Sequence, residues 1–121
     1  GIVFFFDYPG IATLPTKEKI LLNKITASVQ LQEVQITIVN IPELLNHLPS
    51  RTSVRFVNAK VIFFTGKLPG LIKQPQINEK YKIVSEGSND FVLSDILETL
   101  DQNKNLKKNL WNVLKELFPD R

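Results

Sequence analysis

The chain has 121 residues, of which 43% are hydrophobic and 22% charged, ordinary values for one globular domain. It has no cysteine and one histidine, so disulfides, thiolate metal sites and a cysteine nucleophile are excluded, and we expect no metal or other cofactor. Fifteen basic and twelve acidic side chains give a net charge of +3, which permits contact with nucleic acid or an acidic partner without requiring it.

The hydropathy pattern gives an expectation for where the protein is located, and the missing methionine gives one for its N-terminus. The longest apolar run, Ile2–Phe6, is far shorter than the roughly 20 residues that a membrane helix needs. No segment resembles a signal peptide, so we expect a cytoplasmic protein without membrane contact. The length predicts a single α/β domain over 1–121. Because the chain contains no methionine, we expect that this domain lacks a native N-terminal segment.

Strands and helices alternate in the first half of the chain. The continuously apolar run Ile2–Phe6 ends in the turn residues Asp7–Gly10 and predicts a strand buried on both faces. The elements predicted after it are a helix over 17–28 capped by Thr16, a strand over 34–39, a short helix over 42–48 and a strand over 61–64. Residues 52–57 fit a strand or a helix, and we favour a helix because a crossover must return the chain to a parallel third strand.

The second half predicts a hairpin followed by two helices. The elements are a hairpin of segments 81–84 and 91–93 about the turn 86–89, a helix from a Ser94 cap through Thr99, and a last helix over 106–117 capped by Asp101 or Asn103 and ended by Pro119. Leucine and valine recur at helical spacing in the last helix, which makes it amphipathic. The whole order predicts an α/β fold, a three-layer α/β/α sandwich around a mainly parallel four-stranded sheet, closed by a C-terminal amphipathic helix.

Ligands of such sheets bind beyond the carboxyl ends of the strands. The residues predicted to gather there are Asp7, Tyr8, Pro9, Gly10, Asn40, Thr65 and Gly66. In this strand-end pocket Asp7 could position a water and Tyr8 could stack on a base. Ordinary turn chemistry at Asp7, with Tyr8 covering the end of the sheet, is the interpretation that we favour.

Other polar and aromatic residues are candidates for binding rather than catalysis. His47 lies on the predicted short helix with no carboxylate visible in the sequence to orient it, so we interpret it as a surface residue and predict no catalytic residue. Lys107 and Lys108 lie beside Trp111 on the last helix and form a candidate interface. We favour a solvated face for the lysines and core packing for the tryptophan over this interface.

The order of elements and several short motifs resemble one family. The motifs are Val39–Asn40, Phe64–Gly66, Leu106–Trp111 and Leu117–Pro119. Over nearly its whole length the chain resembles the psi subunit of bacterial DNA polymerase III, in the divergent single-domain form of Bacteroidetes-type bacteria. The resemblance implies a uracil-DNA glycosylase-like fold, with a parallel four-stranded sheet between helices.

The resemblance also implies a role in replication. Psi subunits are non-catalytic adaptors of the clamp-loader assembly, so the implied partners are a clamp-loader subunit and a chi-like protein, with indirect or weak contact to nucleic acid. Asp7–Gly10 resembles a relic of the first glycosylase motif, but Phe6 stands where active glycosylases carry a glycine, and 85–94 contains no histidine. The rival functions are an active uracil-DNA glycosylase-like enzyme and a nucleotide-binding module.

Overall fold

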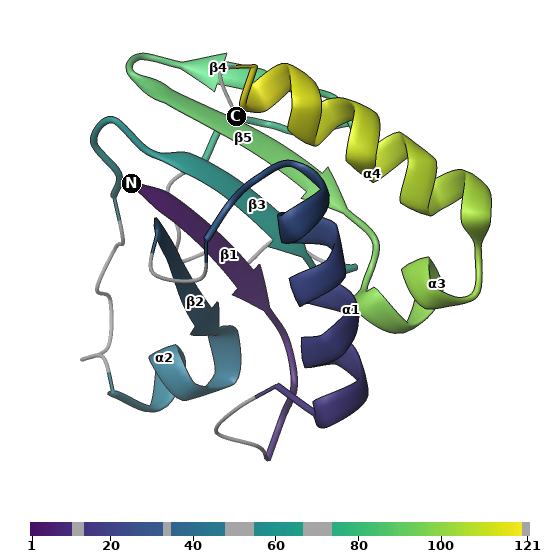
Figure 1. The fold of residues 1–121 in the computed structure, drawn as a ribbon. Coiled ribbons are helices and arrows are strands. Elements are labelled where there is room, and N and C mark those ends of the chain that lie inside the picture. Colours follow the sequence, from purple (N-terminus) through teal and green to yellow (C-terminus); the bar gives the residue numbers. More distant parts are fainter. Residues whose placement is uncertain (11–13, 33–34, 48–54, 67–73, 120–121) are drawn as a thin grey trace.

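The computed structural model describes residues 1–10, 14–32, 35–47, 55–66 and 74–119. In chain order (Figure 1) its elements are β1 (Ile2–Phe6), α1 (Thr16–Ser28), β2 (Ile36–Asn40), α2 (Ile41–His47), β3 (Lys60–Phe64), β4 (Val84–Glu86), β5 (Asn89–Ser94), α3 (Leu97–Asp101) and α4 (Lys104–Leu117).

Within the described residues, the strands form one five-stranded sheet in the order β2-β1-β3-β5-β4. Strands β2, β1, β3 and β5 run parallel, and β4 pairs antiparallel with β5. The α/β class, the largely parallel sheet and the C-terminal helix are therefore confirmed. The predicted strand number of four is corrected to five, because the hairpin adds β4 as an antiparallel edge.

Both faces of the sheet are apolar. Alternate side chains of a strand point to opposite sides, so a continuously apolar strand contributes to both faces. In β1, Phe4 and Phe6 pack on one face and Phe5 packs on the other. In β3, Phe64 joins the first face and Phe63 the second. All five side chains are at most 2% exposed, which explains why these apolar runs show no polar alternation in the sequence.

Phenylalanine rings stack between the neighbouring strands β1 and β3. The ring centroids of Phe6 and Phe64 are 4.9 Å apart, and those of Phe5 and Phe63 are 5.3 Å apart. Each pair is directly in register across the parallel ladder. Such a pair contributes about 0.5–1.5 kcal/mol beyond the area that it buries, so the stacks favour this register over its alternatives.

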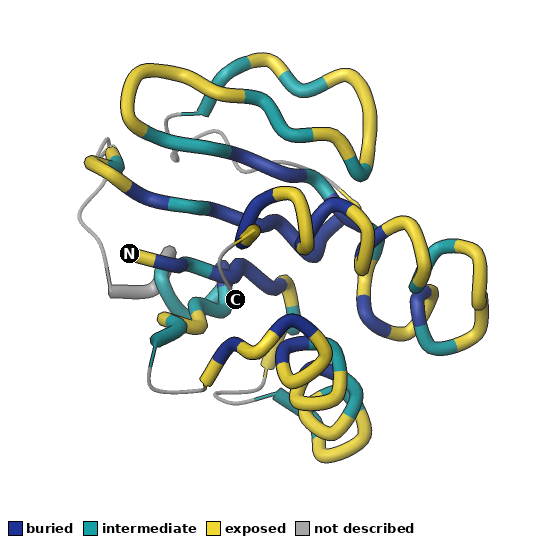
Figure 2. The backbone as a smooth tube through the Cα atoms, turned by 45° about the horizontal axis from the view of Figure 1, so that its top comes forward, coloured by how far each residue is buried: buried dark blue, intermediate teal, exposed yellow. Residues whose placement is uncertain are grey.

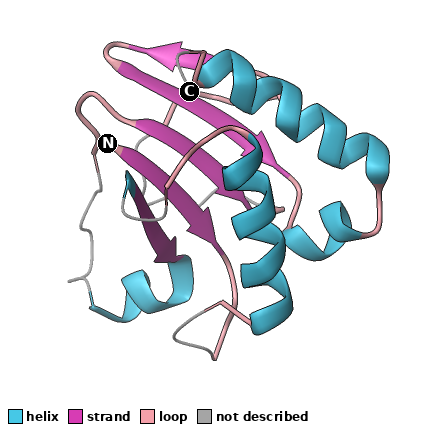
Figure 3. Cartoon of the chain, viewed as in Figure 1, coloured by secondary structure: helices cyan, strands magenta, loops and turns pink. Residues whose placement is uncertain are grey.

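Helices α1, α3 and α4 cover the same face of the sheet (Figures 1 and 3). Their inward leucines, among them Leu22, Leu100 and Leu110, belong to the core of that face. The second face is packed by Ile41 at the start of α2 and by Phe56 and Ile77. Figure 2 shows the resulting pattern, with buried central strands and outer helix surfaces that are exposed.

Helix α4 begins as the sequence predicts. The Asn103 side-chain Oδ1 accepts hydrogen bonds from the backbone N–H groups of Asn105 at 3.0 Å and Leu106 at 3.1 Å. These bonds satisfy two donors that the first helical turn leaves without partners. The buried residues of α4 are Leu110, Val113, Leu114 and Leu117.

Three other predicted boundaries are wrong. Helix α1 includes Thr16, and Pro15 occupies the N-cap position without a side-chain hydrogen bond. Ser94 ends β5 instead of capping a helix, because it pairs in register with Phe64 of β3. Residues 55–57 are not helical, and the predicted helix at 52–54 lies outside the described residues.

Candidate functional site

The structure brings two of the predicted strand-end residues together, although they are 32 positions apart in the sequence. The Asn40 Oδ1 accepts a hydrogen bond from the Tyr8 backbone N–H at 2.8 Å, and the Asn40 Nδ2 donates to the Tyr8 carbonyl at 2.9 Å. The amide therefore extends the pairing of β1 and β2 by one more rung. Asn40 acts here as a clamp on the chain that leaves β1.

The Tyr8 side chain packs against the core rather than extending outward. Its ring stacks on Phe6 with centroids 6.4 Å apart. Burial, with smaller contributions from the carboxylates of Glu18 and Glu98, raises the pKa of Tyr8 to about 12. Its hydroxyl is buried and has no hydrogen-bond partner among the described residues. Tyr8 is thus a neutral, partly buried ring at every physiological pH.

The remaining strand-end residues do not surround a common point. Asp7, Pro9, Gly10 and Gly66 are exposed, whereas Thr65 is buried. Gly10 has a φ of +80°, a backbone conformation that glycine adopts without strain, so it serves the turn after β1. Because Asp7 is exposed, water hydrates its carboxylate, and the described residues do not enclose that group in an apolar pocket.

Sequence reasoning missed a polar cluster at the carboxyl end of β5. The Asp95 carboxylate accepts hydrogen bonds from the Tyr81 hydroxyl and from the Lys80 Nζ, each at 2.5 Å. Burial disfavours the Asp95 carboxylate, but these two hydrogen bonds outweigh burial and lower the pKa of Asp95. Burial and the same bond to Asp95 raise the pKa of Tyr81 to about 12.

This cluster borders a cavity of about 320 Å³ beside α4. The lining residues are Lys80, Tyr81, Asn109, Asn112, Val113 and Glu116. Tyr81 has a φ of +60°, so its backbone is held in a conformation uncommon for a residue with a side chain. The one feature of the sequence that could have indicated this cluster is Asp95, an aspartate directly after a strand. Its partner Tyr81 comes from a segment fourteen residues earlier, so local patterns do not reveal the contact.

The predicted interface residues do lie together on one side of α4. At 3.6 residues per turn this side spans about 100° of the helix circumference. It carries Lys104, Lys107, Lys108, Trp111 and Lys115, a set that we call the basic flank. The opposite side carries Asn105, Asn109, Asn112 and Glu116 and faces the cavity.

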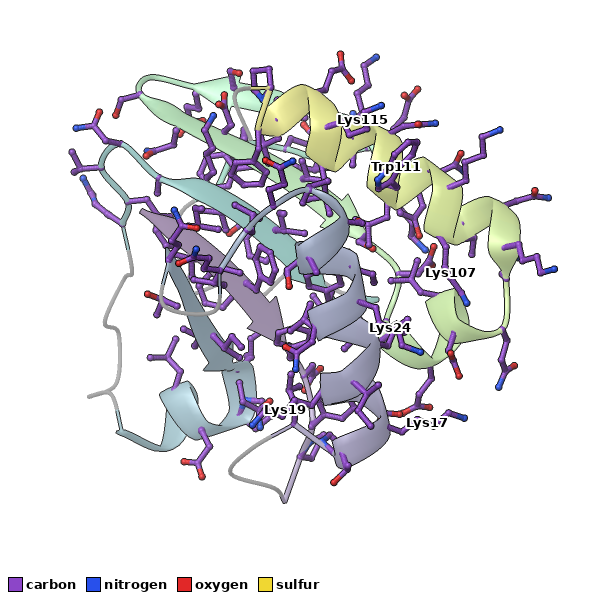
Figure 4. All side chains as sticks on the ribbon, in the orientation of Figure 1. Lys17, Lys19, Lys24, Lys107, Trp111 and Lys115 are labelled. Atoms are coloured by element: carbon purple, nitrogen blue, oxygen red, sulfur yellow. The ribbon has the colours of Figure 1, made fainter. Side chains whose placement is uncertain are left out.

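Trp111 lies near the centre of the basic flank. It is 38% exposed, so the favoured interpretation of a tryptophan packed in the core is wrong. The Lys115 Nζ lies 4.1 Å from the centroid of the Trp111 ring, a cation–π contact worth about 0.5–1 kcal/mol at an exposed position. Figure 4 shows Lys107, Trp111 and Lys115 following one another along the helix.

Comparison with protein-family models and with curated proteins found no match for this chain. In the described ranges, no group of three or more His, Cys, Asp or Glu side chains is arranged to hold a metal ion. The same part of the chain contains no helix with the length and apolar character to cross a membrane. Function is therefore inferred from the geometry of the strand ends and of the basic flank, together with the resemblance.

Proposed function

We propose that this chain is a non-catalytic adaptor of the replicative DNA polymerase, similar to psi subunits in the clamp-loader assembly. The supporting observation is the contact between Asn40 and Tyr8 at the strand ends. In parallel α/β enzymes this edge holds the groups that react with substrate. In this chain the Asn40 amide is committed to holding backbone, and the Tyr8 ring is committed to the core.

The environment of Phe6 favours the adaptor over a glycosylase. Phe6 precedes Asp7, where active glycosylases carry a glycine, and its ring is 0% exposed and stacked on Phe64. A base-excising enzyme needs a pocket that takes a nucleotide flipped out of its stack. A ring fixed in the core beside Asp7 leaves the chain little freedom to open such a pocket.

We extend the proposal to the fold, as a three-layer α/β/α sandwich of the uracil-DNA glycosylase type. Support comes from the parallel strands β2, β1, β3 and β5, which supply the four-stranded parallel sheet that the resemblance implies. Helices α1, α3 and α4 form one outer layer. The residues that pack the opposite face, including Ile41 and Phe56, belong to the second layer.

A binding experiment tests the adaptor. The complete protein, immobilised through a C-terminal tag, is mixed with purified clamp-loader subunits and with a chi-like protein. We expect retention of a clamp-loader subunit at a stoichiometric level. If none of the clamp-loader subunits is retained, that result would contradict the adaptor role.

An activity assay tests the rival enzyme. Single-stranded DNA containing uracil is incubated with the protein and then treated with alkali to cleave abasic sites. We expect no cleavage above the background of the Asp7→Asn variant. Cleavage that depends on Asp7 would identify a glycosylase and overturn the proposed function.

A further inference from the structure

The basic flank holds its charges where the helix itself disfavours them. Lys104, Lys107 and Lys108 occupy the first turns of α4, and the first turn has no acidic residue. The positive end of the helix dipole repels cations at this position. These lysines therefore contribute little to the stability of α4.

Neighbouring charges leave the basic flank positive. The one acidic residue of α4, Glu116, lies on the asparagine side of the helix, outside the roughly 100° that the basic flank covers. On α1, Lys17 pairs with Asp101 of α3 at 3.2 Å, which neutralises that carboxylate and shows which side of α1 faces α3. Lys24 lies seven residues further along the same side of α1, is exposed, and adds a positive charge there (Figure 4).

Trp111 adds an exposed, flat aromatic ring to the positively charged basic flank. Trp111 is exposed, and the group over its ring is the ammonium of the exposed Lys115. Base stacking on an aromatic ring contributes more than an exposed cation–π contact does. A base can therefore displace Lys115 from the ring, and the released ammonium can pair with a phosphate.

We propose that the basic flank binds single-stranded nucleic acid, with a base stacked on Trp111 and phosphates paired with the surrounding lysines. Charge complementarity with a polyanion and an exposed ring among the cations are the two features that such binding requires. The lysines extend over eleven residues, or about 16 Å of helix, a length equal to four or five stacked nucleotides.

Two other anionic partners fit this surface less well. An acidic peptide is held mainly by apolar anchors in pockets, and three cavities among the described residues lie away from the basic flank, at Gln76–Val84, around Phe56, and on the asparagine side of α4. Duplex DNA keeps its bases stacked inside, where Trp111 cannot reach them. In addition, α4 buries one side of its second half, at Leu110, Val113, Leu114 and Leu117, and so presents only its remaining sides to a groove.

Trp111 is the only tryptophan, so its fluorescence reports binding at this surface directly. The protein is titrated with an oligothymidylate of about 16 nucleotides at several salt concentrations. We expect quenching that saturates, with an affinity that falls linearly on a log–log plot against salt. A fluorescence signal unchanged by the oligonucleotide would overturn the proposal.

Two pairs of variants test whether binding depends on the basic flank or only on the net charge of the protein. Lys107→Gln with Lys108→Gln is expected to make the salt slope about 1.4 less steep, which is about 25-fold in affinity between 1 M and 0.1 M salt. The matched control, Lys19→Gln with Arg55→Gln, removes the same charge from exposed positions on α1 and next to Phe56, which packs on the face of the sheet opposite α4, and should leave the slope nearly unchanged. Equal weakening by both pairs would refute a specific surface.

A labelled oligonucleotide measures the role of the ring itself. Trp111→Leu should weaken binding about tenfold by anisotropy while the salt slope stays the same. Circular dichroism of each variant checks that the fold is retained. Polyglutamate binding more tightly than the oligonucleotide would assign the flank to a protein partner, and equal affinity for duplex DNA would exclude single-strand recognition. The proposal is independent of the clamp-loader experiment, which uses protein partners only.

Discussion

The clamp between Asn40 and Tyr8 gives a quantitative prediction for stability. Asn40→Ala removes two hydrogen bonds to the Tyr8 backbone, at 2.8 Å and 2.9 Å. Each such bond contributes about 0.5–1.5 kcal/mol net, so we expect the free energy of unfolding to fall by about 1–3 kcal/mol. For a chain of 121 residues this corresponds to a melting temperature lower by roughly 4–12 °C.

A second substitution at the same position tests the geometry through pH. Asn40→Asp keeps the acceptor for the Tyr8 N–H but places a carboxylate oxygen against the Tyr8 carbonyl, where the amide now donates. This contact disfavours the charged form, so the introduced carboxyl has a higher pKa in the folded protein than its unfolded value of about 3.9. The penalty relative to the wild type is therefore full at neutral pH, diminishes as the pH falls through the raised pKa of the folded protein, and reaches its minimum once the pH is below about 4.

Thermal and urea unfolding followed by circular dichroism measure both variants. Asn23→Ala, on the exposed side of α1, is the matched control and should change stability by no more than about 0.5 kcal/mol. The reasoning would be refuted if Asn40→Ala melted with the wild type, or if the Asn40→Asp penalty stayed constant between pH 7 and pH 3.

Three further substitutions follow from the same contacts. Tyr81→Phe removes the hydroxyl bonded to Asp95 and should lower the free energy of unfolding by about 1–2 kcal/mol at pH 7, measured with urea. Because the pKa of Asp95 is lowered in the fold, this loss should shrink as the pH falls through the range where Asp95 becomes protonated. A loss that does not depend on pH would contradict this reasoning. Tyr8→Phe removes a buried hydroxyl without a described partner, so unfolding should show equal or up to about 1 kcal/mol greater stability, and a clear loss would reveal a partner for that hydroxyl. Asn103→Ala removes the cap of α4 and should lower stability by about 1 kcal/mol, with Asn105→Ala as a control expected to have little effect.

Much of the fold could be predicted from local patterns. The apolar runs at Ile2–Phe6 and Val61–Phe64 identify β1 and β3, because a strand buried on both faces needs no polar alternation. The leucine spacing and Asn103 identify α4, because the helix period and its cap are local properties of the chain. The grouping of lysines around Trp111 also follows from this period alone.

The tertiary structure decided which of these elements meet. The fifth strand β4 is fixed by its ladder to β5, and Ser94 is strand rather than helix cap because Phe64 lies beside it. The clamp of Asn40 on Tyr8 and the bond of Tyr81 to Asp95 join residues 32 and 14 positions apart. The sequence by itself determined the types of β1, β3 and α4 and the composition of the basic flank, since these depend on neighbours within a few residues. Strand order, and the use of Tyr8 and Asn40 to close the strand ends, depend on packing between distant segments, so only the folded chain determines them.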